Sequence, residues 1–243
     1  MSTATIFQRE LQSYFTTPIA YVFIVIFLLL TGIFTFYFGQ FFYRAQADLT
    51  PFFSFHPWIY MIFIPALTMR LWAEERKSGT IELLFTLPLT TMQIVVGKFL
   101  AAWCFTLLSL ILTMPIWICV NYLGEPDNGV ILASYFGSLL MTGGFLAIGA
   151  CVSAVTKNQV VAFVLSVLIC LLINLSGFPL VTDMLKNWLP EIIVETISSF
   201  SFISNFDVLT KGIVDLKSLC FFISLIVFSL YVNAVLIDVK KAD

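Results

Sequence analysis

Long apolar stretches separated by short polar segments make up most of the chain. Six of these stretches contain no Asp, Glu, Lys or Arg, and each is long enough for the roughly 20 helical residues that cross a bilayer. Within or around them we expect membrane-spanning helices at about 18–42, 52–72, 91–121, 129–155, 159–181 and 218–237. The pattern therefore predicts an all-α polytopic membrane protein, with one transmembrane domain over residues 1–243 and six transmembrane helices.

Composition excludes several other classes of protein. Hydrophobic residues make up 60% of the chain and charged residues 11%, whereas soluble domains average about 45–50% apolar and about 25% charged residues. The net charge is only −2. A soluble globular protein, a disordered chain and a nucleic-acid binder with a basic face are therefore excluded.

The distribution of Lys and Arg predicts the orientation, because short cytoplasmic loops carry an excess of them. An even number of spans places both termini on one side. With the termini in the cytoplasm, the inner basic residues are Arg9, Arg70, Arg76, Lys77, Lys98, Lys157, Lys240 and Lys241, and the outer ones are Arg44, Lys186, Lys211 and Lys217. The inner excess predicts cytoplasmic termini.

The segment before the first span has its own periodicity. Its apolar positions recur at helical spacing and its polar positions face away from them. The apolar positions are Phe7, Leu11, Tyr14 and Phe15, and the polar ones are Gln8, Arg9, Glu10 and Gln12. This spacing predicts an N-terminal interfacial amphipathic helix at 3–16. A simple flanking segment of the first span is the alternative.

Residues that would carry self-contained catalysis are missing from the sequence. The five cysteines lie in apolar stretches, and a single histidine, His56, cannot build a zinc or haem site. We expect no metal site, and we expect His56 in an interfacial aromatic belt. No phosphate-binding loop occurs, since Gly97-Lys98 is followed by Phe99. Ionisable groups are absent from the span centres, which argues against an ion-driven transporter, although serines and broken helices can also bind Na⁺.

Charges concentrate between the second and third spans, where Glu74, Glu75, Arg76, Lys77 and Glu82 lie within nine residues. Gly79 should break a helix that continues from the second span. Thr80 can cap a short amphipathic helix with Ile81, Leu84 and Phe85 on one apolar stripe, and Pro88 ends it. A loop that only fixes topology is the alternative.

The sequence of this segment also resembles the pattern of a known protein family. The pattern Met69-Arg70-x-x-Ala73-Glu74-Glu75-Arg76-Lys77-x-Gly79-Thr80-x-Glu82-Leu83-Leu84, then Leu87-Pro88-Leu89 and Gly97-Lys98, resembles that of ABC-2-type transporter permeases. It is most similar to the gliding-motility-type branch, which is related to permeases of multicopper-enzyme maturation systems. Further matches are Arg9-Glu10-Leu11-x-x-Tyr14-Phe15, Thr156-Lys157-Asn158-Gln159 and Lys211-Gly212-Ile213-Val214-Asp215. Arg is common in the family at the position of Lys211, and the charge is kept.

The resemblance implies a permease subunit whose ATPase is a separate chain, so that this chain binds no cofactor and ATP and Mg²⁺ belong to the partner. Residues 73–88 would be the coupling helix that contacts the ATPase. Its candidate contacts are Glu74, Glu75, Arg76, Gly79, Thr80, Ile81, Glu82 and Leu84, and the supporting cytoplasmic contacts are Arg9, Glu10, Lys98 and Asn158.

The outer region at 183–217 mixes charged and apolar residues. Gly177 and Pro179 should break the fifth helix just before it. The resemblance suggests short helices that re-enter the outer leaflet and shape an external gate, with Gly177, Pro179, Gly212 and Asp215 as candidate gate residues. An ordered external loop is the alternative.

The implied partners are an ABC ATPase in the cytoplasm, a second copy or a related permease, and membrane lipids, with an external accessory protein as a further candidate. The implied location is the bacterial inner membrane. We expect a permease that exports or extrudes an unidentified substrate. Two alternatives remain open: a membrane anchor that transmits ATPase-driven motion without transport, and an ion-driven secondary transporter.

Overall fold

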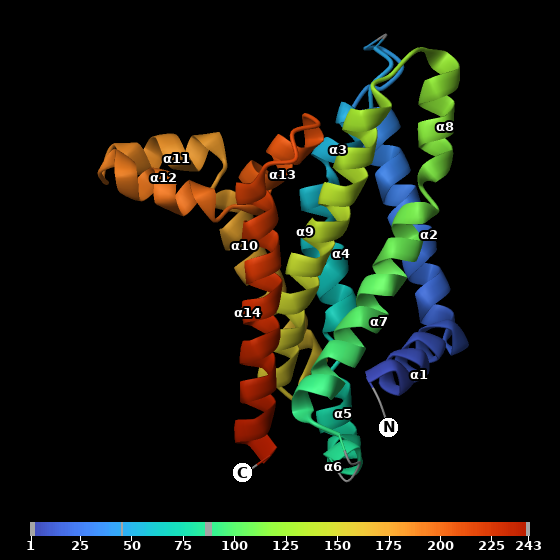
Figure 1. The fold of residues 1–243 in the computed structure, drawn as a ribbon, viewed down its shortest axis with the longest axis vertical. Helices are drawn as coiled ribbons and strands as arrows, with labels where there is room; N and C mark the ends of the chain where they lie inside the picture. The colour runs from blue at the N-terminus through green and yellow to red at the C-terminus, as the bar shows by residue number, and fades with distance from the viewer. Residues whose placement is uncertain (1–2, 45, 86–88, 242–243) are drawn as a thin grey trace.

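The computed structural model describes residues 3–44, 46–85 and 89–241, and in these ranges it contains helices and no strand. Figure 1 shows an elongated bundle. The helices are α1 Thr3–Thr16, α2 Pro18–Ile33, α3 Thr50–Ser54, α4 His56–Thr68, α5 Ala73–Ser78, α6 Thr80–Phe85, α7 Thr91–Ile111, α8 Met114–Leu123, α9 Asn128–Val155, α10 Gln159–Leu175, α11 Pro179–Lys186, α12 Glu191–Ser199, α13 Phe202–Thr210 and α14 Leu216–Lys241. A π-helical segment, Phe34–Phe38, extends α2.

Four segments of the described chain are long and apolar enough to cross a membrane as they stand: Ala20–Phe38, Thr91–Leu123, Asn128–Val155 and Leu216–Lys240. Two bent pairs raise the number to as many as six, if each pair counts as one span. They are α10 with α11, bent by 67°, and α12 with α13, bent by 69°. The all-helical prediction is confirmed, and the count of six spans stays a prediction.

The expected second span, 52–72, is not one helix. It is divided into α3, α4 and a turn at 69–72, and α4 alone has 13 residues, or about 20 Å at the usual helical rise. The break falls at Phe55, just before Pro57, which lies in the first turn of α4. Proline has no N–H to donate, so it begins a helix more easily than it continues one.

Three other predicted boundaries also shift. The first span ends near Phe38 instead of 42, and the third is interrupted between α7 and α8, where Pro115 begins the new helix. The fifth helix ends at Leu175 instead of 181, with Pro179 in the first turn of α11. The break predicted at Gly177 and Pro179 is therefore confirmed, and it falls a few residues earlier than the expected end of the span.

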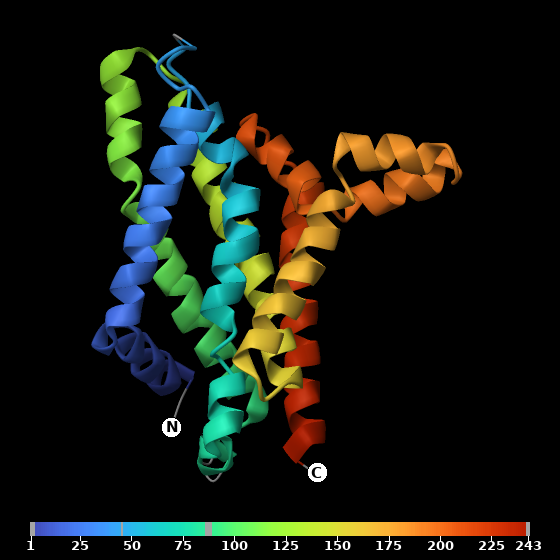
Figure 2. The ribbon, with the colours of Figure 1, turned by 180° about the vertical axis from the view of Figure 1, so that it is seen from behind.

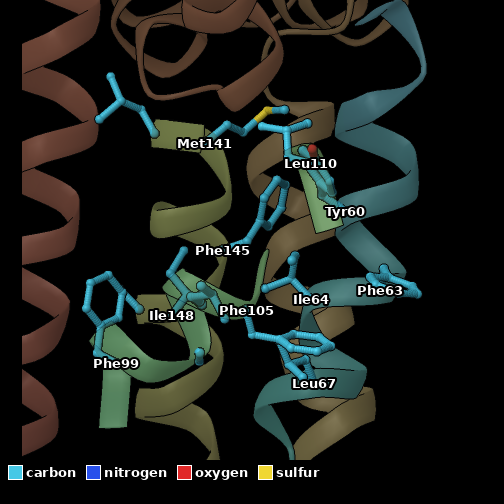
Figure 3. Packing of buried hydrophobic residues seen from close by; sticks show 14 of the residues in the cluster. Tyr60, Phe63, Ile64, Leu67, Phe99, Phe105, Leu110, Met141, Phe145 and Ile148 are labelled. Carbon is cyan, nitrogen blue, oxygen red and sulfur yellow. The ribbon is translucent and has the colours of Figure 1, made fainter. Parts of the chain in front are cut away.

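Helix α9 forms the centre of the bundle and packs against α4, α7, α10, α13 and α14. Figure 3 shows side chains of α4, α7 and α9 meeting in this core, among them Ile64, Phe105 and Phe145. Most small residues of α9 are buried, and a Cβ atom on Gly144 would lie 2.7 Å from the Phe202 ring. The small side chains therefore serve close packing within the chain.

His56 departs from the sequence expectation of an interfacial position. The side chain is completely buried, and its ring lies 4.5 Å from that of Phe52, 5.2 Å from that of Phe53 and 5.1 Å from that of Tyr60. Phe52, Phe53 and Tyr60 enclose the imidazole. Trp58, the neighbour that suggested a membrane-surface belt, packs against Phe178 instead.

The two ends of the described chain lie at one end of the bundle, together with α1, α5 and α6 (Figure 1). Figures 1 and 2 show the α11–α12 hairpin projecting sideways from the bundle, nearer its opposite end. The regions that the sequence assigned to the two sides of the membrane are thus well separated.

Candidate functional site

The charged segment between the second and third predicted spans forms two short helices, α5 and α6. Gly79 separates them with φ +73°, a left-handed conformation that glycine adopts without strain. The hydroxyl of Thr80 lies 2.9 Å from that of Ser78 and donates to the carbonyl of Glu75, so Thr80 ties α6 back to α5. The predicted break at Gly79 is confirmed. The predicted end at Pro88 lies outside the described residues.

A serine on the central helix anchors the beginning of α5. The Ser153 hydroxyl oxygen accepts hydrogen bonds of 3.2 Å from the backbone N–H groups of Trp72 and Ala73, and it donates to the Met69 carbonyl at 3.1 Å. One side chain of α9 thus satisfies three backbone groups of the turn that leads into α5. Buried backbone groups of this kind need a partner.

Arg76 also joins α5 to α9. Its guanidinium donates to the Ala154 carbonyl at 2.8 Å, and Lys240 of α14 donates to the same carbonyl at 3.2 Å and to that of Val155. Cations are favoured there because the last carbonyls of a helix carry its negative dipole end. Arg76 therefore points inward, toward the bundle.

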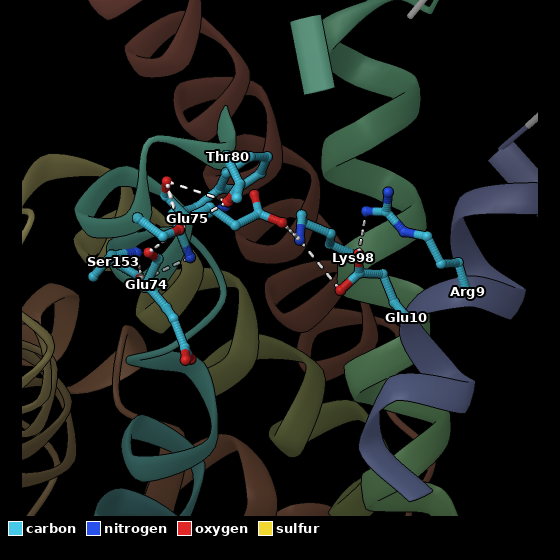
Figure 4. Close-up of polar contacts among 10 residues, drawn as sticks. Arg9, Glu10, Glu74, Glu75, Thr80, Lys98 and Ser153 are labelled. Carbon is cyan, nitrogen blue, oxygen red and sulfur yellow. Dashed lines mark hydrogen bonds and ion pairs between the residues drawn. The ribbon is translucent and has the colours of Figure 1, made fainter. Parts of the chain in front are cut away.

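The buried amino group of Lys98 lies between carboxylates from two other helices (Figure 4). It donates to Glu75 Oε1 of α5 at 2.7 Å and lies 3.2 Å from Glu10 Oε2 of α1. Lys98 is only 2% exposed, and its Nζ atom lies 5.3 Å from the centre of the Trp72 ring. We call Arg9, Glu10, Glu75 and Lys98 the Lys98 junction.

Charges balance within the junction, because Arg9 Nη2 pairs with Glu10 Oε1 at 2.7 Å and supplies a second cation. Burial alone would raise the pKa of Glu10, but the charges and hydrogen bonds of Lys98 and Arg9 hold that pKa below its ordinary value. The second oxygen of Glu75 is buried without a hydrogen-bond partner among the described atoms. The junction thus depends on Lys98 to hold two carboxylates that would otherwise be poorly solvated.

Helix α1 reaches the junction because it lies directly against α7. A Cβ atom on Gly97 would lie 2.9 Å from Ile6 Cγ2 and 3.3 Å from the Thr3 carbonyl oxygen, so only glycine allows this approach. The Tyr14 and Phe105 rings stack at 5.2 Å. A helix is present at Thr3–Thr16, and its position at the membrane interface stays a prediction. Glu10 does not face away as expected, since its side chain turns inward to Lys98 and is only 15% exposed.

In the described part of the predicted coupling segment, fewer side chains are exposed than the sequence predicts as contacts. The Glu74 side chain is 54% exposed, with one oxygen 3.7 Å from Arg70 Nε. Glu82 and Thr80 are exposed, and Ile81 is half-buried against the core. The side chain of Leu84 lies outside the described residues. Glu75 and Arg76 hold α5 in place. The predicted contacts that remain exposed are Glu74, Gly79, Thr80 and Glu82.

Asn158 serves its own helix. Its side chain accepts a 2.9 Å hydrogen bond from the Val160 N–H and so caps the beginning of α10. The structure does not bring Asn158 into the Lys98 junction.

The candidate gate residues lie at both ends of α13, not in one cluster. A Cβ atom on Gly177 would lie 2.2 Å from Ser204 Oγ, in the first turn of α13. Gly212 follows the last turn with φ +79°, and Asp215 accepts from the Lys217 N–H at 3.3 Å before α14 begins. Pro179 opens α11. All four positions are turns or helix starts.

Sequence reasoning missed Ser153 and the inward role of Arg76. In the sequence, Ser153 is one of several small residues in the span predicted at 129–155, and its local pattern gives no signal of the contact with α5. In the described ranges, no group of three or more His, Cys, Asp or Glu side chains is placed to hold a metal ion.

Comparison with known proteins agrees with this architecture. The family model described as ABC-2 family transporter protein matches residues 4–237, nearly the whole chain. Comparison with curated proteins gives no match. Members of this family are membrane subunits of ATP-binding cassette transporters, in which the ATPase is a separate chain. The chain therefore belongs to the ABC-2 family of transporter proteins and is a permease subunit.

Proposed function

We propose that this permease couples ATP hydrolysis by a separate cytoplasmic ATPase to the export or extrusion of a substrate, and that it belongs to the gliding-motility-type branch. In this proposal α5 and α6 are the coupling segment, the termini are cytoplasmic, and a second permease copy or a related chain completes the pathway in a bacterial inner membrane. ATP and Mg²⁺ bind to the partner.

The observation that carries the proposal is the Lys98 junction. A loop that only fixed topology would need exposed positive charge and nothing more. Here a lysine that is 2% exposed joins carboxylates from the first helix and from the coupling segment. Breaking such a buried network costs several kcal/mol, so α1, α5 and α7 should move together.

Docking of the ATPase is supported by the two kinds of side chain on α5 and α6: some bind to the bundle, and others remain exposed. Glu75 and Arg76 bind to α7 and α9, whereas Glu74, Thr80 and Glu82 remain at the surface. An element fixed on one side and free on the other suits a contact that transmits force. Exposed carboxylates also favour a partner surface that carries Lys or Arg.

The proposed mechanism follows from the packing. Closure of the ATPases on ATP would shift α5 and α6. Lys98 would pass this shift to α7 and α1, and Ser153 and Arg76 would pass it to α9, the centre of the bundle. The spans would then tilt as rigid bodies, and the binding of ATP would favour one of two states. The turns at Gly177 and Gly212, which flank α13, would accommodate the change at the external gate.

The test is affinity purification of the tagged full chain from its native membrane in mild detergent, with mass spectrometry of bound proteins. We expect a chain with a phosphate-binding loop to co-purify, and Glu82→Arg to reduce its recovery by about tenfold, as for loss of a contact between opposite charges. Glu195→Arg is the matched control, because it reverses an exposed charge on α12, near the other end of the bundle.

Recovery of the permease without such a chain, under native expression, would contradict the proposal. Equal recovery from the wild type and from Glu82→Arg would move the docking contact away from α6. The external accessory protein would be identified in the same experiment as a bound chain whose recovery falls with changes in α11 or α12.

A further inference from the structure

Helix α10 is attached to the bundle by one narrow stripe of its surface. Its buried residues are Ala162, Ser166, Cys170 and Asn174, each four positions after the last, so they form a single line along the helix. Three of these side chains are small and the fourth is polar, and none is a large hydrocarbon side chain. We call these four residues the α10 stripe.

The α10 stripe meets its neighbours mainly on α4 and α9, since α10 packs against both helices. In Figure 2, α10 (yellow to orange) runs beside α4 (cyan). The side-chain N–H of Asn174 donates to the Pro57 carbonyl of α4 at 3.2 Å. The Asn174 carbonyl accepts from the Ser201 hydroxyl at 3.2 Å, just before α13 begins. Two hydrogen bonds thus hold the end of α10 that leads to α11.

Two polar atoms of the stripe, Ser166 Oγ and Asn174 Oδ1, are buried without a hydrogen-bond partner among the described atoms. By contrast, the buried Ser109 of α7 donates to the Phe105 carbonyl of its own helix at 3.0 Å. An unpartnered buried atom has lost the hydrogen bonds that water would supply, and an apolar group of the same shape would be more favourable there. The sequence therefore keeps a cost in this contact that lasts only while the stripe is covered.

A second state in which α10 lies apart from α4 would remove this cost, because water could then reach both atoms. The coupling segment is connected to both helices. Helix α4 leads through the turn at 69–72 into α5, and α5 also contacts α10. A displacement of α5 therefore acts on both sides of the contact between α4 and α10.

We propose that α10 separates from α4 when the ATPases close on ATP, and that water then reaches Ser166, Cys170 and Asn174. The separation rests on the function proposed above, because ATP supplies the displacement through α5. The other side of α10 carries exposed apolar side chains such as Val164, Leu168 and Leu172. This side remains in contact with hydrocarbon in both states, so the binding of ATP has to expose only the polar stripe.

The test uses Cys170, which is completely buried, as a native reporter. The other four cysteines are replaced by alanine, and the full chain is purified with its ATPase. A positively charged methanethiosulfonate, which modifies thiols that water reaches, is added with or without ATP, Mg²⁺ and vanadate. We expect the nucleotide to raise the labelling rate of Cys170 by about tenfold or more, as for a shift from a mostly closed to a largely open population. Ala101→Cys in the cysteine-free chain is the matched control, because Ala101 of α7 is equally buried and should stay unlabelled.

Ser166→Ala tests the role of the unpartnered hydroxyl. It should favour the closed state, so that labelling of Cys170 with nucleotide slows by about fivefold or more while the unfolding temperature stays at or above that of the parent chain. Ser109→Ala removes a buried hydroxyl that has a partner, and it should leave the labelling rate unchanged.

ATP hydrolysis, measured before vanadate is added, separates this separation of helices from the function on which it rests. Hydrolysis with an unchanged labelling rate of Cys170 would overturn the separation and leave the ATPase contact intact. So would equal labelling of Ala101→Cys, since the whole bundle would then have loosened, or equal rates for Ser166→Ala and its parent. A purified chain with neither ATPase nor hydrolysis would instead contradict the proposed function, and the separation with it.

Discussion

The two ends of this permease use charge in opposite ways. Near α1 and α5, Lys98 is buried and shared by two carboxylates from other helices. On the α11–α12 hairpin, Lys186 pairs with Asp183 of its own helix, and the two side chains are 52% and 71% exposed. The first arrangement joins elements that are distant in sequence, whereas the second joins neighbours on one helix.

This difference indicates which end of the molecule can transmit a displacement from one helix to another. A buried ion pair is costly to break once formed, while an exposed pair contributes little. The Lys98 junction therefore makes three helices mechanically one unit. The hairpin, which projects from the bundle in Figures 1 and 2, can change its position without such a loss. The following substitutions test the contrast, starting with the largest expected effect.

Lys98→Met should have the largest effect. It leaves the partly buried carboxylates of Glu10 and Glu75, which are 15% and 20% exposed, without their shared cation. This loss should lower the free energy of unfolding by about 3–5 kcal/mol. Thermal unfolding in detergent measures this loss. Lys186→Met, the matched change at the exposed pair, should stay within about 0.5 kcal/mol of the wild type. Similar losses for both variants would remove the contrast between the two ends.

Gly97→Ala should come next. The new methyl group would meet Ile6 and force α1 away from α7, at a cost of about 1–3 kcal/mol. Gly32→Ala provides the control, because a Cβ atom at Gly32 in α2 would have no neighbour within 4 Å among the described atoms, and alanine is the better helix former. The same unfolding assay should show the control at or above wild-type stability. A neutral Gly97→Ala would mean that α1 does not depend on this contact.

Gly79→Ala should have a smaller effect, of about 1 kcal/mol, because φ is +73° and a Cβ atom meets no described neighbour there. Gly79→Asn should cost less, since asparagine tolerates this conformation better. Limited proteolysis between α5 and α6 would report the local change. Equal cleavage of both variants would show that the left-handed turn does not determine the geometry of the segment.

The smallest expected effect concerns pH. Lys98 and Arg9 hold the pKa of Glu10 in the folded protein below its ordinary value. Its carboxylate therefore contributes stability that is present above the pKa of the unfolded chain, about 4.3 for Glu, and that is lost as the pH falls through the lower folded pKa. Between about pH 6 and about pH 3, the melting temperature should fall more steeply for the wild type than for Glu10→Gln. Parallel curves would mean that Glu10 contributes nothing to acid sensitivity.

Much of the fold follows from local pattern in the sequence. Hydropathy predicts the helical bundle, Gly79 and Gly177 predict breaks, and helical spacing predicts α1. These features depend on residues close together in the chain, where period and backbone preference are informative.

The candidate site was harder to predict because it depends on contacts between distant positions. Lys98, Glu10 and Glu75 were each singled out, yet Glu10 was expected to face away. Its inward turn follows from the approach of α1 to α7 at Gly97, which no periodicity reveals. His56 is similar: the adjacent Trp58 suggested a belt, and only packing shows that Phe52 and Tyr60 enclose the imidazole ring.

The most direct test of the account is whether α1 and α5 move together. Spin labels at Gln8 and Lys77, both exposed, in a background without the five native cysteines, would report the distance between the two helices by electron paramagnetic resonance. We predict one distance distribution that stays unchanged when ATP and Mg²⁺ are added to the purified complex, and that broadens with Lys98→Met. A clear shift on adding ATP to the otherwise unaltered complex would contradict the claim that the Lys98 junction makes these helices one unit.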